Sequence, residues 1–145
     1  MAFPVVVSLH LNVGSRKPLL PVERVSALLE QGLEGDRHQR TAQGRRTVLL
    51  MEQEVLDQFG LAPGAVREQV TVRGLELAKL VFGSRLKIGS ARLEVGGMCA
   101  PCERMNELKP GLRGELEGRR GRFMRIVEAG SFAVGDAITV EPPAS

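Results

Sequence analysis

The chain has 145 residues and a mass of 15.7 kDa, which suits one domain around a single core. Hydrophobic residues make up 43% and charged residues 26%, so wholesale disorder and a fibrous repeat are excluded. The formal charge of +3 rests mainly on arginine, which suits phosphate or carboxylate recognition but is too small to indicate a nucleic-acid partner. With five Phe and no Trp or Tyr, base-stacking surfaces are poorly supplied, and we expect no nucleic acid among the partners.

Apolar runs are all shorter than the roughly 18 residues that a membrane-spanning helix needs, so we expect no membrane segment. The first residues lack the basic leader and long apolar core of a secretory signal. Cys99 and Cys102 form one C-x-x-C segment rather than a disulfide framework. Together these features predict a cytoplasmic protein.

Short strands separated by glycine-bearing turns dominate the pattern, which favours a barrel or a sandwich. The turn Ile88-Gly89-Ser90-Ala91 predicts a hairpin between two alternating strands. The predicted strands, in chain order, cover Val5 to Leu11, Thr47 to Leu50, Gln69 to Val72, Arg85 to Ile88, Ala91 to Val95, Arg122 to Glu128 and Ala137 to Val140.

Helical signals are fewer. The segment from Met51 to Phe59 has an apolar face and a glycine after it, which predicts a short helix. A second short turn is predicted at Leu75 to Leu80, whereas Val22 to Gln31 fits either a helix or a strand. The stretch from Arg113 to Arg122, rich in arginine and glycine, is interpreted as a mobile solvated loop, with a lid or rim for an anionic partner as the alternative. Pro142 and Pro143 cannot donate to a sheet, so we expect residues 142–145 to fray. The residues before them, 1–141, are predicted to form one domain.

A polar cluster runs from Gly32 to His38, with glycines at 32 and 35, and precedes an apolar strand; Asp36, Arg37 and His38 project together from it. Its two readings are a solvated charged loop and an oxyanion pocket in which Arg37 and His38 donate to phosphate or oxo groups. Arg67 and Glu68, at the start of a strand, are predicted either to form an ion pair with each other or to bind a ligand. His10, in the first strand, is interpreted as structural because no second metal ligand lies at strand spacing.

The segment from Gly96 to Asn106 contains the residues that are best suited to reactive chemistry. Glycines allow a close backbone approach, and Arg104 favours the thiolate form of a neighbouring cysteine. Cys102 is therefore a candidate nucleophile or soft metal ligand. A structural zinc site, a dithiol redox centre and an inert buried pair of cysteines remain open alternatives.

The order of these motifs resembles that of the MOSC domain family, named from the C-terminal part of molybdenum cofactor sulfurase. The resemblance extends from Ser8 to Val140. It rests on the order and spacing of Gly35 to His38, Val48-Leu49-Leu50 with Glu52, Arg67-Glu68-Gln69, Gly74 to Leu77, Gly83 to Gly89, Pro101-Cys102 and Gly135-Asp136.

The resemblance implies a mainly β fold, a MOSC-type β-barrel similar to the β-barrel domain of pyruvate kinase, with a few short helices. It implies that Cys102, which follows a proline, carries persulfide sulfur or ligates molybdenum, for both of which a soft thiolate is suited. The residues that it implies on the cofactor side of the pocket are Asp36, Arg37, His38, Arg67 and Glu68, with Gln69 where the family has asparagine; Arg104 is expected to tune the thiol.

The expected function is that of a stand-alone protein that binds the molybdenum cofactor (molybdopterin) or carries sulfur, with Cys102 at its centre. The expected partners are an anionic pterin cofactor and a cysteine desulfurase or electron-transfer protein. No pyridoxal phosphate is expected on this chain, because the sulfurase's desulfurase domain has no room in it. The alternative is a small reductase of N-hydroxylated compounds that works with an electron donor.

Overall fold

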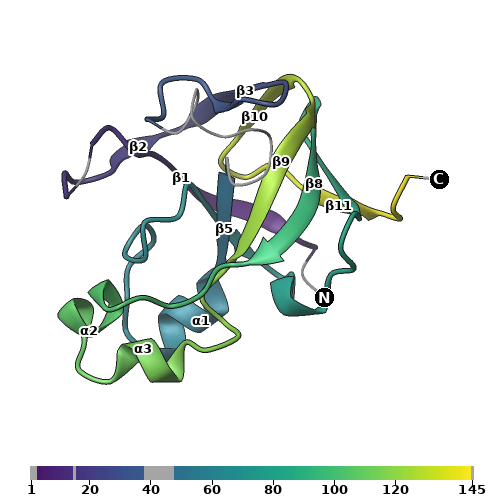
Figure 1. Cartoon of the computed structure of the whole chain (residues 1–145). Coiled ribbons are helices and arrows are strands. Elements are labelled where there is room, and N and C mark those ends of the chain that lie inside the picture. Colours follow the sequence, from purple (N-terminus) through teal and green to yellow (C-terminus); the bar gives the residue numbers. More distant parts are fainter. Residues whose placement is uncertain (1–2, 15, 38–47, 145) are drawn as a thin grey trace.

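The computed structural model describes residues 3–14, 16–37 and 48–144 and is mainly β, with a few short helices (Figure 1). No helix in these ranges is long and apolar enough to cross a membrane. The strands are β1 (Val5–Leu11), β2 (Leu20–Val22), β3 (Arg24–Leu28), β4 (Gly32–Leu33), β5 (Val48–Glu52), β6 (Val70–Arg73), β7 (Arg85–Ile88), β8 (Ala91–Met98), β9 (Arg122–Glu128), β10 (Gly130–Ala133) and β11 (Ile138–Glu141). The helices are α1 (Gln53–Gln58), the 3₁₀ turn η1 (Leu77–Lys79), α2 (Arg104–Leu108) and α3 (Leu112–Glu115).

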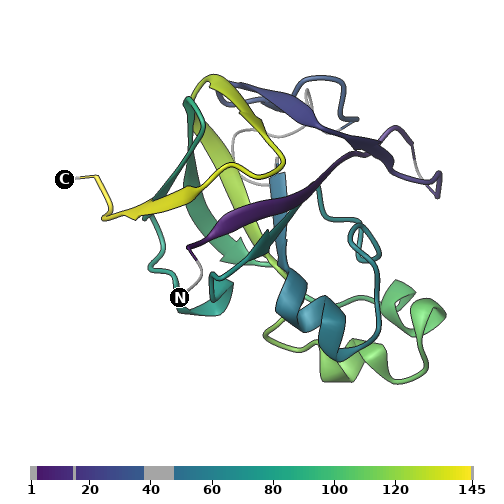
Figure 2. The ribbon, with the colours of Figure 1, turned by 180° about the vertical axis from the view of Figure 1, so that it is seen from behind.

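The strands form two sheets. The larger has the order β11-β7-β8-β9-β5-β6-β1-β2, and the smaller has the order β10-β3-β4. Val5 forms an isolated antiparallel bridge with Ala137, which brings the start of β1 beside the segment that leads into β11 (Figure 2). Among the described residues, β1 and β11 are not paired by a continuous set of hydrogen bonds that would close the sheet, so the closed barrel stays a prediction.

Each segment expected to be a strand contains one, with Thr47 lying outside the described residues, and Ile88 pairs with Ala91 across the expected hairpin. The helix expected at Met51 begins only at Gln53, because Met51 and Glu52 pair with β6 as the end of β5. The ambiguous segment from Val22 to Gln31 contains β3, paired with β10 and β4.

The solvated loop expected from Arg113 to Arg122 is wrong over much of its length. Helix α3 occupies its beginning, and both Arg120 and Arg122 are buried. The Arg122 guanidinium donates to the carbonyl oxygens of Gly96, Leu77 and Leu80 at 2.7–2.8 Å. Burial lowers the pKa of Arg122 from its ordinary value. The side chain therefore ties η1 to the end of β8 instead of entering solvent.

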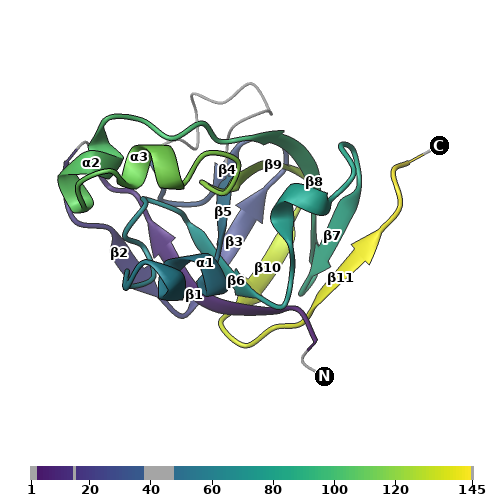
Figure 3. The same ribbon diagram turned by 90° about the horizontal axis from the view of Figure 1, so that it is seen from below.

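Two apolar clusters organise the molecule. The larger lies within the sheets and includes Leu50, Leu93 and Phe132. The smaller packs α1 against α2 and α3 and includes Leu56, Met105 and Leu112. In Figure 3 the three helices lie together, and α2 and α3 are at the end of the molecule away from β7 and β11. The helices and their apolar cluster thus form a separate packing unit beside the larger sheet.

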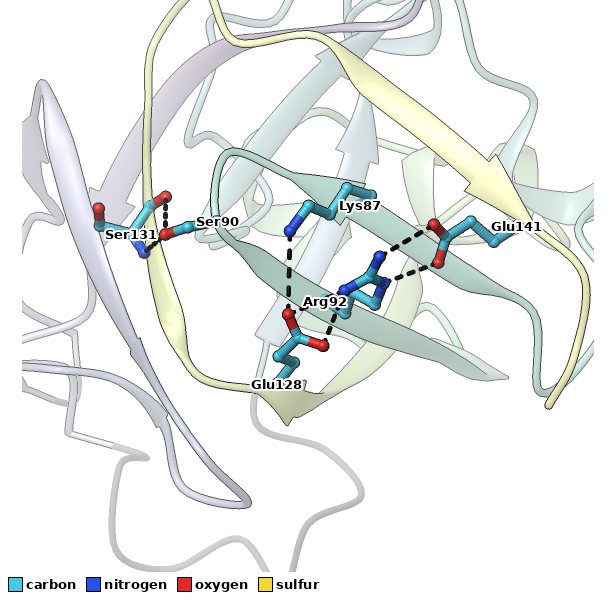
Figure 4. A network of polar contacts seen from close by, with 6 residues as sticks. All are labelled: Lys87, Ser90, Arg92, Glu128, Ser131 and Glu141. Atoms are coloured by element: carbon cyan, nitrogen blue, oxygen red, sulfur yellow. Dashed lines mark hydrogen bonds and ion pairs between the residues drawn. The ribbon is translucent and has the colours of Figure 1, made fainter.

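Ion pairs cover the outer side of β7, β8 and β9 (Figure 4). Arg92 contacts Glu128 at 2.7 Å and Glu141 at 2.9 Å, and Lys87 approaches Glu128 at 3.9 Å. The Arg92 guanidinium lowers the pKa of Glu141 below its usual range. The network links the edge strand β11 to β8 and lies apart from the candidate site described next.

Candidate functional site

Asn12, just after β1, joins the two polar motifs that the sequence singled out. Its backbone N–H donates to Asp36 Oδ2 at 2.8 Å, and its carbonyl accepts from the Arg37 N–H at 2.7 Å. Its side-chain Oδ1 accepts from Arg67 Nη2 at 3.3 Å. Asp36, Arg37 and Arg67 come together here although the motifs are about thirty residues apart in the chain.

Gln69 links the same region to the sheet. Its Oε1 accepts from the Leu49 N–H at 2.9 Å, and its Nε2 lies 3.4 Å from both carboxylate oxygens of Asp36. Both Gln69 and Asp36 are buried. The Asp36 carboxylate thus faces backbone and amide donors inside the protein, which fits a side chain that positions Arg37.

Glu68 points inward and holds a turn. Its side chain is fully buried, and Oε2 accepts from the Gly64 N–H at 2.8 Å and from Thr71 Oγ1 at 2.6 Å. Its Oε1 has no hydrogen-bond partner within the part of the chain that the structure describes. Glu68 therefore fixes the turn over residues 62–65, and it is not placed as an ion-pair partner of Arg67.

Arg67 is the residue that this turn presents to the exterior. Its φ of +69° lies in the left-handed region, which a non-glycine residue rarely adopts outside functional loops. Its guanidinium donates to the carbonyl oxygens of Lys17 and Gly14, the latter at 3.0 Å. These acceptors are neutral, so its charge is not neutralised by them.

A pocket of about 520 Å³ lies between this turn, the β1–β2 connection and helix α2. Arg67 and Arg104 both line it, and Glu107 and His10 contribute to its walls. The remaining lining residues are mostly apolar: Pro18, Leu19, Pro21, Ala62, Pro63, Gly64, Ala65, Met105 and Leu108. Apolar walls with a few charged groups are typical of small-ligand sites.

Positive charge dominates one side of the pocket. Burial, then the neighbouring charges of Arg104 and Arg37, lower the pKa of Arg67. Glu107 partly offsets this charge, but its carboxylate pairs with Arg16 at 3.2 Å. An anion against Arg67 and Arg104 would relieve their mutual repulsion, so the residues present fit a phosphate or oxo group.

Cys102 is exposed and lies two residues before Arg104, which lines the pocket; Cys102 itself is not one of the lining residues. Its carbonyl accepts from the Met105 N–H at 2.9 Å, which fixes the chain direction into α2. A second hollow of about 420 Å³ is lined by Gly96, Gly97 and Met98, so residues 99–103 lie in the chain between residues that line the two hollows. The exposed Cys102 is thus close in the chain to an arginine-lined pocket.

His38 falls outside the described residues, so its expected place beside Arg37 is untested. No cluster of three or more His, Cys, Asp or Glu side chains placed to hold a metal occurs in the described part of the chain. A metal held by the described residues near Cys102 would therefore need ligands that the bound group itself brings.

His10 is a member of the site that the sequence analysis set aside. It is 7% exposed, lines the pocket, and its Nε2 lies 3.2 Å from Ser8 Oγ. Within the described ranges its Nδ1 has no hydrogen-bond partner. The signal in the sequence was the alternation of Ser8 and His10 along an otherwise apolar strand, which places these two polar side chains on one face.

The comparisons with known proteins give the family. A family model, the MOSC domain, matches residues 42–139. The chain belongs to the MOSC domain family, whose members are associated with the molybdenum cofactor. The search of curated proteins gave no match.

Solved structures agree on the fold. The YuaD protein from Bacillus subtilis matches with a TM-score of 0.79 at 18% identity, over 97% of both chains. YiiM from Geobacillus stearothermophilus matches with a TM-score of 0.75 at 17% identity, over 94% of this chain and 74% of that one. YiiM from Escherichia coli matches with a TM-score of 0.71 at 17% identity, over 97% of this chain and 71% of that one. At this identity the likeness shows the fold and does not show the substrate.

Proposed function

We propose that this protein binds the molybdenum cofactor, or carries sulfur for it, with Cys102 as the functional thiolate. One observation carries the proposal: the exposed Cys102 lies two residues before Arg104, which lines a pocket together with Arg67, and the two guanidinium groups repel each other. A bound anion offsets that repulsion, and a soft thiolate beside it suits persulfide sulfur or molybdenum. The association of MOSC domains with this cofactor supports the same assignment.

The residues of the site divide into two groups. Arg67, Arg104 and Arg37 bind the anionic part of the cofactor, and His38 joins them on the family resemblance alone. Asp36 and Glu68 hold the backbone that presents Arg37 and Arg67, because their carboxylates accept buried N–H groups. When bound, the cofactor supplies a molybdenum centre for which the Cys102 sulfur is a suitable ligand.

The test measures how much cofactor and sulfur the purified protein carries. Wild type, Cys102→Ser and Cys99→Ser are purified from a host that makes the cofactor, and pterin, molybdenum and labile sulfur are measured per chain. We expect the Cys102→Ser protein to lose most of the molybdenum or labile sulfur, while Cys99→Ser, the matched control, still loads. Equal loading of wild type and Cys102→Ser would refute the role given to Cys102.

The cytoplasmic location, the cysteine desulfurase or electron-transfer partner, and the reduction of N-hydroxylated compounds remain predictions. Turnover of a hydroxylaminopurine with a flavin or iron–sulfur donor would support the reductase alternative. Absence of turnover by loaded protein would reject it.

A further inference from the structure

The two cysteines lie on a short segment that is anchored at both ends. At one end the Cys99 N–H donates to the Gly121 carbonyl at 2.9 Å, directly after β8 has paired with β9. At the other end the Cys102 carbonyl accepts from the Met105 N–H. Between them lie only Ala100, which is exposed, and Pro101, which is buried. Only two residues therefore separate the cysteines, and neither cysteine belongs to a helix or a strand.

Accessibility differs between the two thiols. Cys102 is exposed, whereas Cys99 is half-buried, with its Sγ 3.8 Å from the Ala100 carbonyl oxygen. A sulfur donor in solution therefore meets Cys102 more readily than Cys99. The half-buried thiol is better placed to react with what Cys102 already carries than with a large partner.

We propose that Cys99 is the resolving thiol that releases sulfur from a Cys102 persulfide, an inference that rests on the sulfur-carrying form of the proposed function. The Cys99 thiolate attacks Cys102 Sγ, the bond from that atom to the outer sulfur breaks, and the outer sulfur leaves with the electron pair as hydrosulfide. The two cysteine sulfurs are oxidised to a disulfide, the outer sulfur is reduced to sulfide, and the proton of the Cys99 thiol passes to water. A dithiol reductant then restores both thiols.

The step requires the segment to bend. A disulfide requires Cα atoms about 4.4–6.8 Å apart, and the backbone from Cys99 to Cys102 has no turn in the structure, so it must bend at Ala100 and Pro101 before the bond forms. The two hydrogen bonds at its ends, from the Cys99 N–H to Gly121 and from the Met105 N–H to Cys102, lie outside the Ala100–Pro101 pair.

The experiment loads the reduced wild type, Cys99→Ser and Cys102→Ser proteins with inorganic polysulfide and removes the excess. Mass spectrometry follows persulfide and disulfide, and a fluorescent bimane reagent measures released sulfide. We expect wild type to release sulfide and form the 99–102 disulfide at least about tenfold faster than Cys99→Ser releases sulfide, because the internal thiol acts at a high effective concentration. Cys99→Ser is expected to retain its persulfide on Cys102.

Each result decides a different point. Persulfide on Cys102 that decays equally fast in wild type and Cys99→Ser overturns the role of Cys99 and leaves the sulfur-carrier function intact. Wild type that loads no more sulfur than Cys102→Ser overturns the sulfur-carrier function and the inference with it.

A second measurement does not depend on the variants. Wild type equilibrated in glutathione buffers of graded potential is expected to interconvert between dithiol and 99–102 disulfide, read by alkylation and peptide mapping. Mixed disulfides with glutathione on Cys102, without any 99–102 bond, would also refute the proposal.

Discussion

Arg67 combines an unusual backbone with a charge-dense environment. Its left-handed φ turns its side chain toward the pocket while the next residue, Glu68, enters the interior. Its donors hold the carbonyls of Gly14 and Lys17, so the same guanidinium fixes the β1–β2 connection and faces the ligand space. Charge and planar donor geometry therefore both matter at this position.

Replacing Arg67 by lysine tests that point. The ammonium keeps the charge but cannot donate to several fixed acceptors, so we expect phosphate or pterin affinity to fall about tenfold and stability to fall by about 1 kcal/mol. Isothermal titration and urea unfolding measure the two effects. The control is Arg24→Lys on β3, whose guanidinium donates to Ser131 Oγ at 3.4 Å and lies outside the pocket lining. Equal losses of affinity in both variants would contradict the role of Arg67.

His10 predicts a pH dependence of stability. Burial lowers the pKa of His10 below its ordinary 6.5, and the charge of Glu68 opposes this shift. The unfolded imidazole therefore takes up a proton at a higher pH than the folded one, and the folded state loses stability as pH falls below the unfolded value. We expect His10→Gln to lose less stability than wild type between about pH 7 and about pH 5, as measured by urea unfolding. Parallel stability curves would count against this explanation.

The site was partly predictable at this scale. The residue pattern singled out Asp36, Arg67 and Cys102 but left a structural and a functional interpretation open for each, and the family resemblance assigned them to the site. The sequence could not separate residues that face the pocket from those that face inward. Glu68 and Asp36 accept buried N–H groups from segments distant in the chain, and only the tertiary contacts reveal that.

At the scale of elements, the hairpin between β7 and β8 depends on glycine. Gly89 has φ +57°, and a Cβ there would lie 2.3 Å from the Ser131 carbonyl oxygen. The close approach brings β10 against the hairpin, where the Ser90 N–H donates to the same carbonyl at 3.0 Å. A side chain at this position would push the two sheets apart.

Gly89→Ala is therefore expected to cost about 3 kcal/mol or more, because it adds a backbone clash to the left-handed strain. Gly118→Ala is the matched control: Gly118 also has positive φ, +77°, but a Cβ there meets nothing within 4 Å. Its expected cost is about 1 kcal/mol, from backbone strain alone. Chemical unfolding of both variants measures the difference, and similar costs would show that the clash is relieved elsewhere.

Strands were easier to predict than helices in this chain. Alternation over β1, β7 and β9 is a local signal, so their residue ranges match the expected ones. Helices α2 and α3 have five and four residues, too few for a period of 3.6 to show. They form because Met105 and Leu112 pack on α1, which is a tertiary cause. Strand β10 was missed because its partner is β3, about a hundred residues earlier.

At the scale of the whole molecule, the two apolar clusters have different structural roles. The sheet cluster maintains the scaffold, and the helical cluster holds α2, which carries Arg104 and Glu107 into the pocket wall. The pocket therefore lies between a part with many long-range strand contacts and a smaller part joined to it by short helices. Local opening is expected to begin in the smaller part.

Leu112→Ala and Leu93→Ala compare the two clusters, since both leucines are fully buried. Each is expected to cost about 2–5 kcal/mol on a cavity basis. We expect hydrogen exchange to rise mainly over α2 and α3 in Leu112→Ala, and across β7, β8 and β9 in Leu93→Ala. Ligand affinity should fall more in the former at a temperature where both remain folded. An even rise of exchange over the whole chain in both variants would mean that the clusters unfold as one.

The contact between Val5 and Ala137 has a practical consequence for experiments. It draws the beginning of β1 and the strand β11 to one end of the molecule, while α2 and the pocket wall occupy the other (Figures 1 and 3). A tether, label or fused carrier attached through either end of the chain would thus leave the ligand entrance facing the bulk solution. Immobilised protein should consequently bind the proposed anionic ligand as readily as protein in free diffusion.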